Sequence, residues 1–172
     1  MRDRLTFWGP ASGLGVATAV VIFAIDQAYK VAMLYGLGFK DLGPDAYIRV
    51  TSFFDLRMVW NPGVSYGLFE QSTDLGRWML VVFNVLASIG LFVWLSKQYK
   101  GWDAFAIGLV IGGALGNALD RALYGAVADF FSLHAFGYYW YVFNIADVAI
   151  VLGVIMMLVD AFRPAARAED RA

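Results

Sequence analysis

The chain has 172 residues, of which 60% are hydrophobic and only 16% are charged, and its mean hydropathy is +0.63. This composition excludes an ordinary soluble enzyme and a disordered chain, because so much apolar surface cannot be hidden in one small core. The net charge of −1 leaves no basic field to hold nucleic acid, and the absence of cysteine excludes disulfides and thiolate chemistry.

Four apolar stretches are long enough to cross a hydrocarbon layer of about 30 Å, which takes roughly 20 helical residues. We expect membrane-spanning helices at about Gly9–Phe39, Leu75–Leu95, Trp102–Leu119 and Tyr141–Phe162. A basic segment precedes the first stretch, as in a signal peptide, but no small-x-small cleavage pattern follows at a suitable distance. We therefore interpret the first stretch as an uncleaved spanning helix.

The Lys and Arg residues near the predicted helix ends indicate the orientation, since they concentrate on the cytoplasmic side. Three short basic segments fall on one side after four crossings, and they contain Arg2, Arg4, Lys97, Lys100, Arg163, Arg167 and Arg171. We expect both termini in the cytoplasm, and residues 40–74 and 121–140 on the opposite side. The chain then forms a single integral membrane domain, residues 1–172, with a disordered tail at about 164–172.

The first outer segment, about Lys40–Asp74, is too long for a plain connection. Within it, Tyr47–Trp60 is rich in β-branched and aromatic residues at alternating positions, which is typical of a strand. The following Asn61-Pro62-Gly63 indicates a turn. The sequence therefore predicts a small extracytoplasmic β-sheet formed by the first long loop, with its aromatic residues at the level of the lipid headgroups.

The third span carries small residues at a spacing that suits close helix packing. Gly108, Gly112 and Gly116 recur every four residues, and this small-xxx-small pattern lets helices approach closely in lipid. We interpret the pattern as packing alone.

Polar side chains in or beside the spans are costly in lipid, so each one is a functional hypothesis. In the predicted topology they converge at one depth near the outer surface. They are Asp26, Lys30, Asn117, Asp120, Arg121, Asp129, Asn144 and Asp147. Asp26 and Lys30, four residues apart on one helical face, are close enough to pair. We expect Asp26 and Asp120, each with a cation nearby, to be an ion-paired scaffold.

Asp129 and Asp147 are the candidate catalytic pair, since the segment between them is short enough to bring both to one site. Two carboxylates in a poorly solvated site share one proton over a wide pH range. One can accept a proton from water while the other donates to a carbonyl oxygen or a leaving amine. Taken singly, Asp129 is also typical of a loop or capping carboxylate and Asp147 of a buried hydrogen-bonded residue. The only histidine, His134, is assigned no role.

Two other classes of protein remain open on these residues alone. A small proton- or cation-coupled transporter also uses carboxylates within the membrane, although the polar groups here cluster near one side and no inverted repeat is visible. A membrane assembly protein held together by the glycine pattern needs no carboxylate pair. Replacing Asp129 or Asp147 by Asn separates these two classes from a protease that uses the pair. The replacement should abolish cleavage by a protease, abolish flux through a transporter and change little in an assembly protein.

Five blocks can then be read together, and their order along the chain is specific. They are Asp26-Gln27-Ala28-Tyr29-Lys30 (D-Q-x-x-K), Asn61-Pro62-Gly63-Val64-Ser65-Tyr66-Gly67 (N-x-G-x-A-F-G), residues 112–121 (G-G-A-x-G-N-x-x-D-R), residues 127–130 (V-x-D-F) and residues 143–147 (F-N-x-A-D). Together they resemble lipoprotein signal peptidase, also called signal peptidase II. Ser65-Tyr66 replaces the usual Ala-Phe, and Tyr29 stands where a small residue is common.

The resemblance implies an intramembrane aspartyl endopeptidase of the bacterial cytoplasmic (inner) membrane, with its active site near the extracytoplasmic face. Its substrate would be a prolipoprotein, cleaved on the amino side of a cysteine that already carries diacylglycerol. Asp129 and Asp147 align with the catalytic pair. The supporting residues implied by the blocks are Asp26, Lys30, Asn61, Gly63, Asn117, Asp120, Arg121 and Asn144. No metal or organic cofactor is expected; membrane phospholipid is an expected partner, and a monomer is expected.

Overall fold

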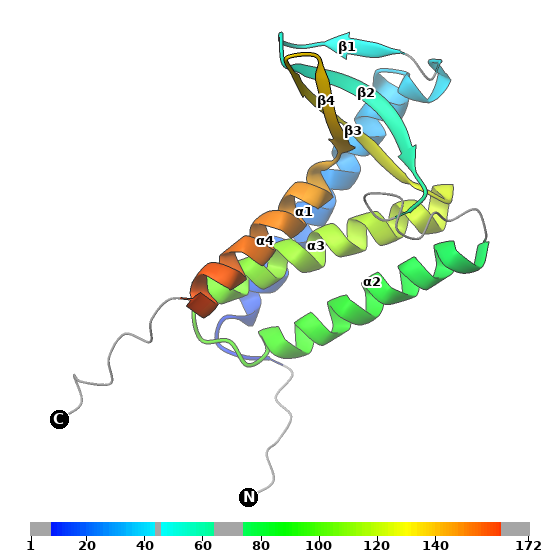
Figure 1. Cartoon of the computed structure of the whole chain (residues 1–172). Coiled ribbons are helices and arrows are strands. Elements are labelled where there is room, and N and C mark those ends of the chain that lie inside the picture. Colours follow the sequence, from blue (N-terminus) through cyan, green and yellow to red (C-terminus); the bar gives the residue numbers. More distant parts are fainter. Residues whose placement is uncertain (1–7, 44–45, 64–73, 163–172) are drawn as a thin grey trace, which may run out of the picture.

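Four long helices form the body of the protein in the computed structural model, which describes residues 8–43, 46–63 and 74–162 (Figure 1). The helices are α1 (Ser12–Val31), α2 (Asp74–Leu95), α3 (Gly101–Tyr124) and α4 (Ile145–Phe162). A π-helical turn at Ala32–Gly36 extends α1. All four are long and apolar enough to cross a membrane, so the expectation of four apolar spans is confirmed.

Three of the helices have boundaries that differ from those expected. The first runs over Ser12–Gly36 and not Gly9–Phe39, since Phe39 belongs to a separate short 3₁₀ helix, Phe39–Asp41. The helix α3 continues past Leu119 to Tyr124 and ends at Gly125, whose φ of 82° gives the left-handed conformation common just after a helix. The last helix does not begin at Tyr141, because Tyr141–Phe143 belong to a β-strand and α4 begins only at Ile145. Asp120 and Arg121 therefore lie within α3, and Asn144 stands immediately before α4.

The helix α3 lies at the centre of the bundle, and α1, α2 and α4 all pack against it. A Cβ atom at Gly112 would lie 2.6 Å from the backbone oxygen of Ala19 in α1, and one at Gly113 would lie 2.5 Å from the backbone oxygen of Ala146 in α4. Gly112, which belongs to the predicted pattern, and the adjacent Gly113 thus allow α1 and α4 to approach the backbone of α3 closely on two sides.

The sheet has four antiparallel strands in the order β1-β2-β3-β4: β1 (Tyr47–Arg49), β2 (Phe54–Asn61), β3 (Val127–Ala135) and β4 (Tyr138–Phe143). The prediction that the first long loop alone forms the sheet is wrong, since β3 and β4 come from the connection between α3 and α4. Their hairpin turns at Phe136 and Gly137, which both have positive φ, as a tight two-residue turn requires.

The sheet lies at one end of the helix bundle (Figure 1). It is joined to the end of α1 by a buried apolar cluster of Met33, Leu34, Phe39, Ala128 and Phe130. The start of α1 and the end of α4 lie together at the opposite end, as expected if both termini share one side. The terminal arginines and the predicted tail lie outside the described residues.

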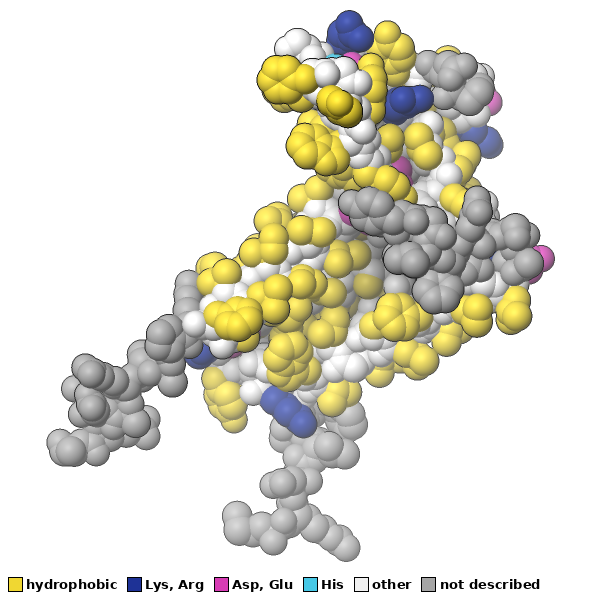
Figure 2. Space-filling view, in the orientation of Figure 1, with side chains coloured by type: hydrophobic (Ala, Val, Ile, Leu, Met, Phe, Trp, Pro, Cys, Tyr) yellow, Lys and Arg dark blue, Asp and Glu magenta, His cyan; other side chains and the backbone are white. Residues whose placement is uncertain are grey.

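The surface separates into bands along the same direction. Figure 2 shows hydrophobic side chains over the helical body on the face in view, with Lys and Arg side chains at its lower edge and over the sheet region at the top. Large apolar side chains such as Phe83, Leu86 and Ile155 are about half exposed or more. An outward apolar surface of this kind is expected where lipid, rather than water, surrounds the helices.

Candidate active site

A buried ion cluster in α1 and α3 forms the base of the site. The Nζ atom of Lys30 lies 2.8 Å from Oδ2 of Asp26 and 2.8 Å from Oδ2 of Asp120. All three side chains are fully buried or nearly so. Gln27 Nε2 lies 3.1 Å from both Asp26 Oδ2 and Asp120 Oδ1, which adds a neutral donor between the two carboxylates. The predicted pairing of Asp26 with Lys30 is present, and Asp120 shares the same cation.

The two carboxylates of this cluster each accept a hydrogen bond from a distant backbone amide. Asp26 Oδ1 accepts from the N–H of Ala146 at 3.0 Å, and Asp120 Oδ2 accepts from the N–H of Ala128 at 3.2 Å. Ala128 immediately precedes Asp129, and Ala146 immediately precedes Asp147. The ion cluster therefore fixes the backbone just before each aspartate of the candidate pair.

Asp129 lies on β3 and is buried, with 1% of its surface exposed. Its Oδ1 accepts from Nδ2 of Asn144 at 2.6 Å, and its Oδ2 accepts from Nδ2 of Asn61 at 3.1 Å. Burial, and secondly the negative charge of Asp147, raise the pKa of Asp129 from 3.8 to about 7, while the two amide donors oppose the rise. Asp129 thus holds a proton for part of the time near neutral pH.

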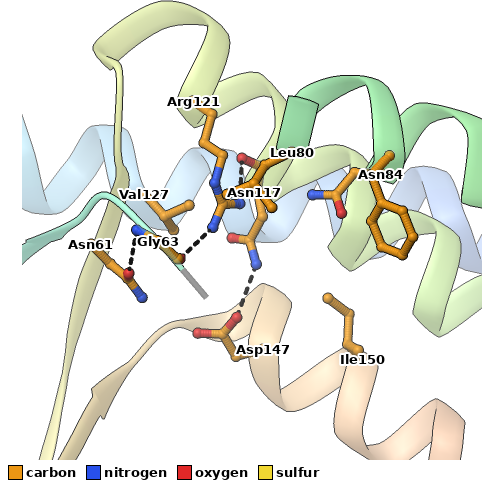
Figure 3. Close-up of a pocket in the computed structure, with 10 residues that line it drawn as sticks. Asn61, Gly63, Leu80, Asn84, Asn117, Arg121, Val127, Asp147 and Ile150 are labelled. Atoms are coloured by element: carbon orange, nitrogen blue, oxygen red, sulfur yellow. Dashed lines mark hydrogen bonds between the residues drawn. The ribbon is translucent and has the colours of Figure 1, made fainter. Parts of the chain in front are cut away.

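Asp147 lies in the first turn of α4 and is held by reciprocal hydrogen bonds. Its Oδ2 accepts from the backbone N–H of Asn144 at 3.2 Å, and its own backbone N–H donates to Oδ1 of Asn144 at 2.9 Å. This arrangement is a capping box, in which the residue before a helix and the third helical residue bond to each other. Figure 3 shows the remaining oxygen, Oδ1, accepting from Nδ2 of Asn117 at 2.9 Å.

Asn144 and Asn117 connect the two aspartates to the ion cluster. Asn144 bonds to Asp129 through its side chain and to Asp147 through its backbone. The Oδ1 atom of Asn117 accepts from Nδ2 of Asn144 at 3.2 Å and from Nζ of Lys30 at 3.4 Å. Each amide can use its donor and its acceptor at the same time, so the aspartates are fixed without further net charge.

Arg121 and Asn61 hold the turn that follows β2. Arg121 Nη2 donates to the backbone oxygen of Gly63 at 2.9 Å, and the N–H of Gly63 donates to Asn61 Oδ1 at 3.1 Å (Figure 3). Asn61 therefore starts the turn and also contacts Asp129. Residues 64–67, the rest of this sequence block, lie outside the described residues.

All ten predicted site residues belong to one connected set of hydrogen bonds and ion pairs. His134 stands apart, on the far part of β3, where its Nε2 lies 3.0 Å from Asp55 Oδ2. Within the described ranges, no group of three or more Asp, Glu or His side chains is arranged to hold a metal ion.

A cavity of about 200 Å³ adjoins this set (Figure 3). It is lined by Asn61, Gly63, Leu80, Phe83, Asn84, Asn117, Arg121, Val127, Asp147 and Ile150. A second, mostly apolar groove of about 500 Å³ runs beside Asp147 along Tyr141, Phe143 and the outer side of α4. Polar and charged groups thus meet apolar surface at Asp147.

Two polar residues of the site were missed by sequence reasoning. Tyr141 accepts from Nδ2 of Asn61 at 3.0 Å through its hydroxyl oxygen, and Asn84 lines the cavity from α2. Tyr141 gave no usable signal among the aromatic residues around it. Asn84 did, because an amide in the middle of an otherwise apolar span is costly in lipid.

Comparison with known proteins gives a consistent result. The family model for signal peptidase (SPase) II matches residues 18–163. A lipoprotein signal peptidase of Methylorubrum extorquens is 49% identical over 154 residues, which cover 90% of this chain and 88% of the relative. Another, of Methylobacterium radiotolerans, is 48% identical over 158 residues, which cover 92% of this chain and 90% of the relative.

Two solved structures share the fold. One, described as a bacterial membrane enzyme at 2.3 Å resolution, has a TM-score of 0.78 at 26% identity and covers 93% of this chain and 94% of its own. A second, at 1.9 Å resolution, has a TM-score of 0.74 at 28% identity and covers 88% of this chain and 94% of its own.

Proposed function

The chain belongs to the signal peptidase II family, and from that premise we propose that it is an aspartic endopeptidase that removes signal peptides from bacterial prolipoproteins. The observation that carries the aspartic mechanism is the arrangement of Asp129 and Asp147, both hydrogen-bonded to Asn144 and both preceded by a backbone amide tied to the buried ion cluster. The family assignment favours this function over a transporter or an assembly protein.

The pKa of Asp129, raised to about 7, supports a division of labour between the two carboxylates. Asp147 accepts a proton from water as the water oxygen attacks the scissile carbonyl carbon, and Asp129 donates its proton to the carbonyl oxygen. As the tetrahedral intermediate collapses, the C–N bond breaks, the leaving amine takes the proton from Asp147, and the carbonyl oxygen returns its proton to Asp129.

The neighbouring amides and Arg121 support this chemistry by holding the substrate and the surrounding turn in position. Asn61 and Asn117 line the cavity next to Asp147, where their side chains can hold extended substrate backbone or the developing oxyanion. Arg121 fixes the Gly63 turn over the same cavity. The buried ion cluster of Asp26, Lys30 and Asp120 acts indirectly, because it fixes the strand and the helix that carry the two aspartates.

We place the substrate at a membrane interface. Its cleaved bond would lie on the amino side of a cysteine carrying diacylglycerol, whose acyl chains remain among the phospholipids. The sheet end of the protein would face the extracytoplasmic side of the bacterial inner membrane. A monomeric, single-domain enzyme is proposed because one chain supplies every residue of the site.

A gel-shift cleavage assay tests this proposal on a diacylglyceryl-modified prolipoprotein with purified protein in lipid. Asp129→Asn and Asp147→Asn are each expected to lower cleavage by at least about 100-fold, since each removes one proton-transfer group. Asp160→Asn is a matched control, because Asp160 lies in α4 at the opposite end, 3.4 Å from Lys100. Cleavage by either site variant at the parent rate, with normal folding, would refute the assignment.

A further inference from the structure

Asn84 is a polar residue inside an apolar span that the chemistry described above does not use. It lies ten residues after Asp74, where α2 begins, and so about 15 Å along the helix. Its neighbours in sequence, Phe83 and Val85, are apolar and exposed on the outer surface of the bundle. Amide side chains at such depth are unfavourable unless they hydrogen-bond, and they commonly mark a functional site.

The side chain of Asn84 faces the cavity that contains Asp147 (Figure 3). Across the ranges 8–43, 46–63 and 74–162, no group hydrogen-bonds to its side-chain amide; the side-chain hydrogen bond at this residue is from Ser88 Oγ to its backbone oxygen at 2.8 Å. Asn84 therefore does not act as a hydrogen-bonding link between helices. With respect to the described residues, its amide is available to whatever occupies the cavity.

The chemistry around Asn84 restricts what that occupant offers. Leu80, Phe83 and Ile150 line the same part of the cavity, while Arg121 and Asp147 supply the charges nearer the sheet. A neutral amide among apolar groups is suited to a neutral polar group, and buried carbonyl oxygens in a lipid setting need a donor. A molecule cleaved at Asp147 carries carbonyl oxygens in its peptide backbone and, if diacylated, in two esters.

We propose that Asn84 is a substrate-binding residue, whose Nδ2 group donates a hydrogen bond to a carbonyl oxygen of the substrate held beside Asp147. The inference rests on the proposed function and adds to it a contact that sets substrate preference. Because this contact is present before and during the reaction, its loss raises KM and leaves kcat nearly unchanged.

The test compares Asn84→Leu with the parent on a synthetic diacylglyceryl lipopeptide in lipid. Asn84→Leu is expected to raise KM by about 3- to 10-fold, the effect of one hydrogen bond between neutral groups, with kcat within about 2-fold. Leu suits an apolar span, and a thermal unfolding curve checks that the variant is folded. Ser88→Ala is the matched control: Ser88 lies one turn further along α2 and outside the cavity lining, and both constants should stay within about 2-fold of the parent.

A second substrate, with ether-linked alkyl chains, distinguishes the two sources of the carbonyl oxygen. If Asn84 binds an ester carbonyl, the KM of the parent rises by the same factor on the ether substrate, and the KM of Asn84→Leu rises no further. If it binds a carbonyl of the peptide backbone, the KM of Asn84→Leu exceeds that of the parent by the same factor on both substrates. An unchanged KM for Asn84→Leu on both substrates, with the parent active, overturns this inference alone. A parent inactive on every lipidated substrate overturns the proposed function, and this inference with it.

Discussion

Replacing Lys30 by Met should destabilise the protein more than any single neutralisation of its two partners. Lys30 Nζ lies 2.8 Å from a carboxylate oxygen of Asp26 and 2.8 Å from one of Asp120, and both carboxylates are fully buried. The cluster carries a formal charge of −1. Lys30→Met leaves −2 without compensation, whereas Asp26→Asn leaves 0 and retains an oxygen for the N–H of Ala146.

The expected magnitudes follow from this difference. Loss of the only cation from a buried cluster costs about 3–5 kcal/mol of unfolding free energy. Asp26→Asn loses one charge-assisted contact and leaves no bare charge, which costs about 1–2 kcal/mol. The exposed pair of Lys100 and Asp160, whose charged atoms lie 3.4 Å apart, is the comparison for a surface ion pair. Lys100→Met should lower the free energy of unfolding by at most about 1 kcal/mol.

Equilibrium unfolding by denaturant in mixed micelles, followed by tryptophan fluorescence, measures these differences. The chain contains six tryptophans, so the signal is ample. The order of stability should be parent, Lys100→Met, Asp26→Asn and then Lys30→Met. If Lys30→Met is as stable as Asp26→Asn, the cluster is not held by its charge balance and the reasoning is refuted.

Three further predictions follow from named contacts. The pKa of Asp129 rises from 3.8 to about 7 on folding, so the folded state binds this proton more tightly; unfolding free energy should fall as pH rises from about 4 to about 7, by up to about 1.4 kcal/mol per pH unit, and level off above pH 7. Unfolding curves of the parent and of Asp129→Asn across this range should diverge with that slope, and parallel behaviour would contradict it. Gly112→Ala places a Cβ atom 2.6 Å from a backbone oxygen of α1 and should cost about 1–3 kcal/mol in the same unfolding assay, whereas Gly90→Ala, with open space around it, should cost nothing. Tyr141→Phe removes the acceptor 3.0 Å from Asn61 and should shift the basic limb of the pH profile for kcat/KM to higher pH, because Asn61 is then less firmly held as a donor to Asp129 and the pKa of this general acid rises; an unshifted profile would count against this link.

The helices of this fold were predictable because lipid leaves a chain few options. A backbone that crosses hydrocarbon must satisfy its own hydrogen bonds, so long apolar stretches form helices. The second half of the sheet was not predictable in the same way. The start of β3, Val127–Phe130, is buried at every position and so does not alternate, and β4 is a run of aromatic and apolar residues that also suits the start of a spanning helix.

The charged residues of the site were found because of their cost in lipid, and the family motifs pointed to the same positions. Their partners depend on how the helices rotate about their axes, which spacing alone does not determine. The structure shows two hydrogen bonds that the sequence does not predict. Asp120 accepts one from the backbone amide before Asp129, and Asp26 accepts one from the backbone amide before Asp147. Asn84 met the criterion of a polar residue within a span and was overlooked because its neighbours are uniformly apolar.

The hydrogen bond from Ala146 to Asp26 also sets an order of events during synthesis. It joins residues 120 positions apart, so at about 5–20 residues per second the acceptor waits about 6–24 s for its donor to be made. Lys30 follows Asp26 by one helical turn, so α1 can enter the bilayer as an internally neutralised segment. Asp120 and then Ala146 join it later. A nascent chain therefore cannot complete its proteolytic site until α4 has begun to form, which delays cleavage until all four helices of the bundle are in place.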